Sequence, residues 1–257
     1  MTGALAAEWR KLRTLAGPGW LLIGLAVLTA GLSAVVAAAV HFQQGGGQDP
    51  TALSLSGVDL GQAVAAVLGV TVVSGEYGSG MMRLSLAAVP RRWRLLAAKA
   101  ATVAGITLVA GALGVAGSWL AGRLLLAGNG FTAGHGAALL PFTEGTALRA
   151  ELGSILYLTL VALLGLGLAT AIRDTAASVG VVLGLLFVVP VVASLVHDVT
   201  WHRLLQQVAP MTAGLDVQAT TRLGGLPLSP WAGLGVAAAW AGGALLLGGL
   251  RLELTDA

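Results

Sequence analysis

The strongest constraint on this chain is a set of six apolar runs, each long enough to cross a membrane as a helix. The first run shows the pattern, because no charged residue occurs from Gly19 to Val40. A helix of about 20 residues covers a hydrocarbon core of about 30 Å. Only 10% of the residues are charged, whereas soluble domains carry about 25%. We therefore predict an all-α polytopic membrane protein, a single domain over 1–257, with spans near 19–41, 57–76, 95–121, 150–171, 176–196 and 231–250.

The positive charges divide unevenly between the two sides that these spans define. Four arginines fall on the side of the longer loops. The other ten lysines and arginines fall on the side of the two termini: Arg10, Lys11, Arg13, Arg83, Arg91, Arg92, Arg94, Lys99, Arg173 and Arg251. Because short cytoplasmic loops carry the excess of positive charge, we predict that both termini are cytoplasmic. The basic residues lie beside apolar runs without interleaved aromatic residues, so nucleic acid is not an expected partner.

The loop between the second and third spans is the most informative segment of the chain. The apolar run before it ends at Glu76, and an amphipathic stretch follows from Gly80 to Val89. Pro90 ends this stretch, because proline lacks an N–H and disfavours helix at the residue before it. Taken alone, the basic residues that follow Pro90 indicate only that this loop lies on the cytoplasmic side of the membrane.

The residues of this loop resemble those of one transporter family. The order Glu76-Tyr77-x-x-Gly80, a short amphipathic helix, then Pro90-Arg91-Arg92 is similar to the loop after the second span of ABC-2-type permeases, the membrane subunits of bacterial ABC exporters. Residues 8–12, Glu-Trp-Arg-Lys-Leu, and 173–178, Arg-Asp-Thr-Ala-Ala-Ser, resemble words of the same family. The resemblance implies a multi-pass protein of the bacterial cytoplasmic membrane.

In that family the loop forms a coupling helix that docks onto the ATPase. The resemblance implies that this chain pairs with a second permease chain, as a homodimer, and binds two ATPase subunits, which hold the ATP and Mg²⁺. The residues that it assigns to ATPase coupling are Glu76, Tyr77, Gly80, Met81, Met82, Leu84, Leu86, Val89, Pro90, Arg91 and Arg92.

Simpler roles remain open for these residues. Glu76 is either an anchor that pairs with an arginine of the loop or an ordinary acid at the membrane interface. Met81, Leu84, Leu86 and Val89 either fill a groove on the ATPase or rest against the permease or lipid. For the arginines that follow Pro90, contact with headgroups is expected first and contact with the ATPase second.

Residues 1–17 are predicted to form an amphipathic helix in the headgroup region of the membrane. Leu5, Trp9 and Leu12 fall at helical spacing, and Arg10 and Lys11 lie off that line. Tryptophan favours the interface between lipid and water. The alternative is a solvated tail that only sets topology. At the opposite side of the membrane, the apolar stripe of Trp201, Leu204, Leu205 and Val208 predicts a short helix on the outer face, ended by Pro210.

No source of energy is expected within the chain itself. A phosphate-cradling loop needs Gly-x-x-x-x-Gly-Lys-Ser/Thr, and neither Lys11 nor Lys99 stands in that context. The acidic residues lie in loops or at or near the ends of the predicted spans, whereas gradient-driven carriers place them within spans. His135, His197 and His202 are expected in external segments and His41 at the border of the outer face, and the spacing of His197, Asp198 and His202 does not favour a metal. We therefore expect no enzyme, cofactor or metal site in this chain.

Three functions follow as alternatives. The first is the permease subunit of an ATP-driven exporter for a lipophilic drug, antibiotic, lipid or peptide. The second is a non-transporting sensor or assembly module that binds an ATPase, and the third is a self-sufficient channel or carrier.

Overall fold

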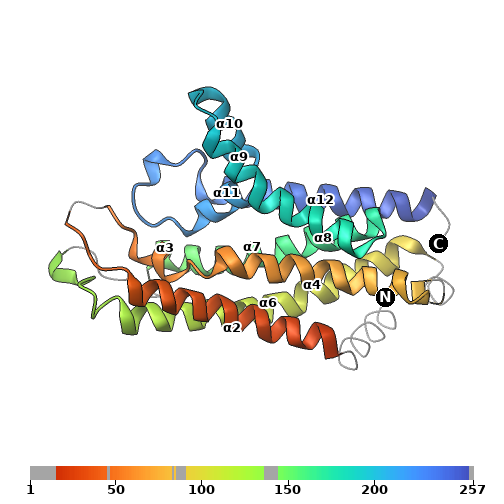
Figure 1. Ribbon diagram of the computed structural model, residues 1–257, viewed down its shortest axis with the longest axis horizontal. Helices are drawn as coiled ribbons and strands as arrows, with labels where there is room; N and C mark the ends of the chain where they lie inside the picture. Colours follow the sequence, from red (N-terminus) through yellow and green to blue (C-terminus); the bar gives the residue numbers. More distant parts are fainter. Residues whose placement is uncertain (1–15, 45–46, 83, 85–90, 136–143, 255–257) are drawn as a thin grey trace.

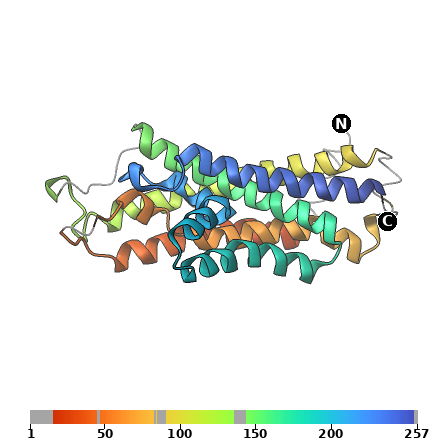
Figure 2. The same cartoon turned by 90° about the horizontal axis from the view of Figure 1, so that it is seen from above.

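The computed structural model describes residues 16–44, 47–82, 84, 91–135 and 144–254. Over these residues the chain is helical, with no β-strand, and six helical segments are long and apolar enough to span a membrane. They form an elongated bundle (Figures 1 and 2). The predicted all-α, multi-pass architecture is therefore confirmed.

The spans begin and end close to the predicted positions, with longer third and fourth spans. They are α2 (Ala16–Ala39), α4 (Val58–Gly78), α6 (Arg92–Leu125), α7 (Gly145–Ile172), the segment Thr175–Leu195 and α12 (Pro230–Leu254). The helix α6 has 34 residues, which is about 51 Å at 1.5 Å per residue. It therefore extends past a bilayer core, and its first turns carry the basic residues that sequence reasoning placed in a loop.

Helix α7 is the centre of the bundle, and it packs against α4, α6 and α12. Glycine makes this possible. A Cβ at Gly69 of α4 would lie 1.9 Å from the carbonyl oxygen of Ala162, and one at Gly167 of α7 would lie 2.5 Å from the carbonyl carbon of Ala244. Without a side chain at these positions, the backbones of neighbouring helices approach closely, as is common in membrane proteins.

Two pairs of glycines, each four residues apart, have different surroundings. A Cβ at Gly57 would lie 1.8 Å from the carbonyl oxygen of Thr29, and Gly61 also packs against Thr29, so the first pair joins α2 to α4. By contrast, nothing lies within 4 Å of a Cβ at Gly180 or Gly184. The second pair therefore makes no packing contact with the described part of this chain.

The fifth span is the least regular of the six. It consists of α8 (Thr175–Leu183), the π-helical turn η2 (Gly184–Val188) and α9 (Val189–Leu195). Pro190 follows this turn. Because proline offers no N–H to the preceding turn, the helix accommodates it by widening locally.

Shorter elements gather at the end of the bundle opposite α2's first residue (Figure 1). They are α3 (Pro50–Ser54), η1 (Ala133–His135), α10 (Val199–Val208), α11 (Pro210–Leu215), η3 (Asp216–Gln218) and η4 (Leu223–Gly225). The helix predicted around Trp201 is confirmed as α10, and it ends before Pro210 as expected. Helix α3 is partly buried: Asp49 caps it, and Ser54 packs on Gly122.

Candidate functional site

The segment predicted to couple to an ATPase begins where α4 ends. Glu76 and Tyr77 lie in the last turn of α4, which runs to Gly78. Gly80 turns the chain with a φ of 70°, a conformation that glycine adopts without strain. Met81, Met82 and Leu84 are helical again.

Several predicted site residues lie outside the described part of the chain. They are Leu86, Val89 and Pro90 of the coupling helix, and Trp9, Arg10, Lys11 and Leu12 of the interfacial helix.

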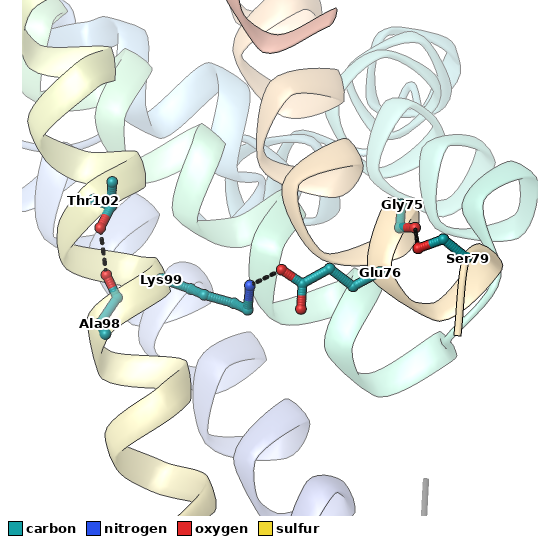
Figure 3. A network of polar contacts seen from close by, with 6 residues as sticks. All are labelled: Gly75, Glu76, Ser79, Ala98, Lys99 and Thr102. Atoms are coloured by element: carbon teal, nitrogen blue, oxygen red, sulfur yellow. Dashed lines mark hydrogen bonds and ion pairs between the residues drawn. The ribbon is translucent and has the colours of Figure 1, made fainter. Parts of the chain in front are cut away.

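A buried ion pair joins α4 to α6 just before the chain leaves the bundle. The Nζ of Lys99 donates a hydrogen bond to Oε1 of Glu76 (Figure 3). The side chains are only 2% and 6% exposed. Lys99, in the second turn of α6, is thus a partner of Glu76 that was not among the arginines expected for it. A buried charge without a partner is costly, so each residue depends on the other.

The C-terminal end of α12 is held by two side chains of α6 and by that of Arg173, which follows α7. The guanidinium of Arg92 donates to the carbonyl oxygens of Leu252 and Glu253, and that of Arg173 donates to the carbonyl oxygen of Arg251 at 3.2 Å. The last carbonyls of a helix have no partner within it and carry partial negative charge, so cations bind there. Trp93 adds an apolar contact, because its ring covers Gly249.

Arg173 also connects this end of the bundle to α4. Its guanidinium lies 5.5 Å from the centre of the Tyr77 ring, in cation–π contact. Arg173 adopts the left-handed conformation, with a φ of 66°, and its N–H caps α7 by binding the carbonyl oxygen of Ala169. Tyr77, predicted as a coupling residue, therefore contacts the turn between the fourth and fifth spans.

Met81, Met82 and Leu84, in the stretch predicted to form the coupling helix, face different ways. Met82 is 3% exposed and belongs to the main hydrophobic core, whereas Met81 and Leu84 are 41% and 64% exposed. The sequence placed all three among the coupling residues, but only Met81 and Leu84 are open to a partner. The start of α6 and the end of α12 form a basic surface, with an open depression of about 660 Å³ lined by Arg91, Arg92, Trp93, Arg94 and Glu253.

The histidines make structural contacts in this fold. Nδ1 of His202 lies 2.8 Å from the carbonyl oxygen of Ala193, and His135 stacks on Phe42 with ring centres 4.9 Å apart. Asp198, next to His197, caps α10 by accepting from two backbone N–H groups. The described residues contain no group of three or more side chains that could hold a metal ion.

Sequence reasoning missed two buried polar features. Lys99 is the only charge within Ala97–Ala101, and a lone charge in an apolar run signals a buried partner. The second feature has no such signal. Tyr157 of α7 donates to the side chain of Gln62 of α4, and Gln218 of η3 donates to Ser154 at 3.0 Å, so contacts distant in sequence form a polar layer.

Comparison of the chain with known proteins identifies no family. No protein-family model matches the chain, and no curated protein matches it.

Proposed function

We propose that this chain is the membrane-spanning permease subunit of an ATP-driven exporter, moved by a separate ATPase. The observation that supports this most is the pair of exposed apolar residues, Met81 and Leu84, on the helical segment that follows Gly80, together with the basic surface at the start of α6. An apolar pair with a charged rim is the kind of surface that binds another protein. Its position matches the coupling helix of the family that the sequence resembles.

The contacts around this segment suggest how a push from the ATPase travels into the membrane. Glu76 and Lys99 fasten α4 to α6, and Arg92 fastens α6 to α12. Tyr77 and Arg173 fasten α4 to the turn after α7. A force applied to Met81 and Leu84 would therefore act on several helices together rather than bend the end of α4 alone.

The remaining parts of this proposal concern partners and orientation. Two ATPase subunits would hold ATP and Mg²⁺, and a second copy of the chain would complete the transport path. The open face of the fifth span, with Gly180, Val181 and Val188, is where a second chain has room to pack. The termini would lie in the cytoplasm of a bacterial cell, with export of a lipophilic substrate across the cytoplasmic membrane.

Binding and stimulation of an ATPase test this proposal. The tagged chain is co-expressed with the ABC ATPase encoded nearest to it, purified, and reconstituted to measure ATP hydrolysis. The double variant Met81→Asp/Leu84→Asp should lose co-purification and stimulation, because both new carboxylates face the partner. Leu113→Asn/Leu120→Asn serves as the control, since these exposed residues of α6 lie away from the segment.

Retained binding and stimulation in the Met81→Asp/Leu84→Asp variant would remove the coupling assignment. Binding of the wild-type chain without substrate-stimulated hydrolysis would favour the sensor or assembly module instead.

One observation favours a second candidate, a carrier driven by an ion gradient. Glu151 lies in the second turn of α7 and is 2% exposed, and neither carboxylate oxygen has a hydrogen-bond partner among the described residues. Buried carboxylates within spans are typical of proton-coupled transporters. The test is uptake of a lipophilic substrate into vesicles that contain the chain, an imposed proton gradient and no ATPase. Uptake that Glu151→Gln abolishes would support this candidate over the first.

A further inference from the structure

Helix α10 turns its apolar face away from the protein. Trp201, Leu204 and Val208 share one face, since they are three, four and seven residues apart. They are 60%, 45% and 50% exposed. An amphipathic helix of a water-soluble surface would bury this face against the core. Here the arrangement is reversed.

The polar face of α10 is the one that binds the protein. Nδ1 of His202 lies 2.8 Å from the carbonyl oxygen of Ala193, and its Nε2 lies 3.0 Å from the side-chain nitrogen of Gln206. Gln207 donates to the carbonyl oxygen of Pro227 at 3.1 Å. These side chains are satisfied inside the fold, so the helix is not held by hydrophobic burial of its apolar stripe.

The apolar face of α10 continues the lipid-facing surface of the spans. At its start, Val192 and Leu195 of α9 are 49% and 68% exposed. At its end, Val208 borders a groove of about 430 Å³ that continues along α7 and α12 past Ala239 to Leu247, and Trp240 of α12 donates to the carbonyl oxygen of Val208. Figure 1 shows α10 standing out from the bundle and turned across its long axis.

We infer that α10 is embedded in the membrane surface, with Trp201, Leu204 and Val208 immersed in the acyl chains of the leaflet opposite α2's first residue. Arg203 is exposed on the other side of the helix, where it reaches headgroups or water. This geometry is that of an interfacial helix, with an apolar face below the headgroups and a cation above. The segment after the fifth span is therefore part of the membrane-contacting surface rather than a water-exposed outer loop. The inference does not depend on the proposed transport function.

The absence of cysteine from the natural sequence makes a direct test possible. Single cysteines replace Leu204, Val208, Arg203 or Gly224 in the full chain, are labelled with a nitroxide, and are reconstituted in phosphatidylcholine–phosphatidylglycerol vesicles. Collision rates are measured with oxygen, which concentrates in acyl chains, and with a water-soluble nickel chelate. Arg203→Cys is the matched control on the opposite face of α10, and Gly224→Cys is the reference in an exposed loop.

We expect labels at Leu204 and Val208 to collide with oxygen several-fold more than with nickel, and labels at Arg203 and Gly224 to show the reverse. Nickel collisions at Leu204 and Val208 equal to those at Gly224 would place the face in water and overturn the inference. Low rates with both reagents would also overturn it, since another protein, such as a second copy, would then cover the face.

A second measurement keeps the test independent of labelling. Lipids brominated below the headgroup should quench the fluorescence of the wild-type chain more than that of Trp201→Phe. Equal quenching would contradict the placement of Trp201 in acyl chains.

Discussion

Removal of Lys99 should destabilise the protein far more than removal of an exposed cation of the same helix. Lys99→Met removes the cation that donates to Oε1 of Glu76, whose carboxylate stays buried between α4 and α6. The two side chains are 2% and 6% exposed, so water has little access to the vacated hydrogen-bonding position. Breaking a buried ion pair in this way costs about 3–5 kcal/mol. The double variant Glu76→Gln/Lys99→Met removes both charges, and its stability should return to within about 1 kcal/mol of wild type.

The free energy of unfolding would be measured by titrating purified protein in mild detergent with SDS. Wild type, Lys99→Met, Glu76→Gln and the double variant form a double-mutant cycle. Arg94→Met is the matched control, because Arg94 is an exposed cation one turn earlier on α6. It should change stability by no more than about 0.5 kcal/mol. If Lys99→Met costs no more than Arg94→Met, or if the double variant is as unstable as the sum of its single changes, the buried pair does not hold α4 to α6.

Three further predictions concern packing and pH. Gly69→Ala should lower the free energy of unfolding by about 1–3 kcal/mol, because the new Cβ would lie 1.9 Å from the carbonyl oxygen of Ala162. The control Gly105→Ala, whose Cβ meets nothing within 4 Å, should be neutral or slightly stabilising. SDS titration compares the two variants. Burial acts to raise the pKa of Asp49, but hydrogen bonds from residues 220, 221 and 52 outweigh it and hold the pKa below 3.8. The stability that Asp49 contributes is therefore full above pH 4 and lost as the pH falls through the folded pKa, so Asp49→Asn, which still caps α3, should flatten the acid limb of a plot of melting temperature against pH. Burial raises the pKa of Asp216 from 3.8 to about 6. The stability that protonated Asp216 contributes to the fold is therefore full below pH 4 and is lost as the pH rises through 6. Asp216→Asn should abolish a decline in melting temperature between pH 4 and 6, and an unchanged decline would contradict this.

The candidate site was partly predictable from the sequence. The sequence indicates where the exposed Met81 and Leu84 lie, because the apolar run ends at Glu76 and a proline and several arginines follow at 90–94. The orientation of Met82 could not be predicted, because the direction of a side chain depends on where the short helix after Gly80 rests. The contact between Glu76 and Lys99 could not be predicted either. It depends on the second turn of α6, which begins at Arg92, packing beside the end of α4.

The amino-acid sequence alone determined that this is a helical, multi-pass membrane protein and where its spans lie. An apolar run of 20 residues must satisfy its backbone hydrogen bonds internally in lipid, and a helix is the structure that does so within one segment. Tertiary structure decided which faces of those helices meet. Gly69 and Gly167 became contact points whereas Gly180 did not, and the apolar stripe of α10 faces outward although its pattern alone suits either direction. The periodicity of a sequence shows that a helix has an apolar and a polar face. Which of these faces contacts protein and which contacts lipid depends on the helices packed around it.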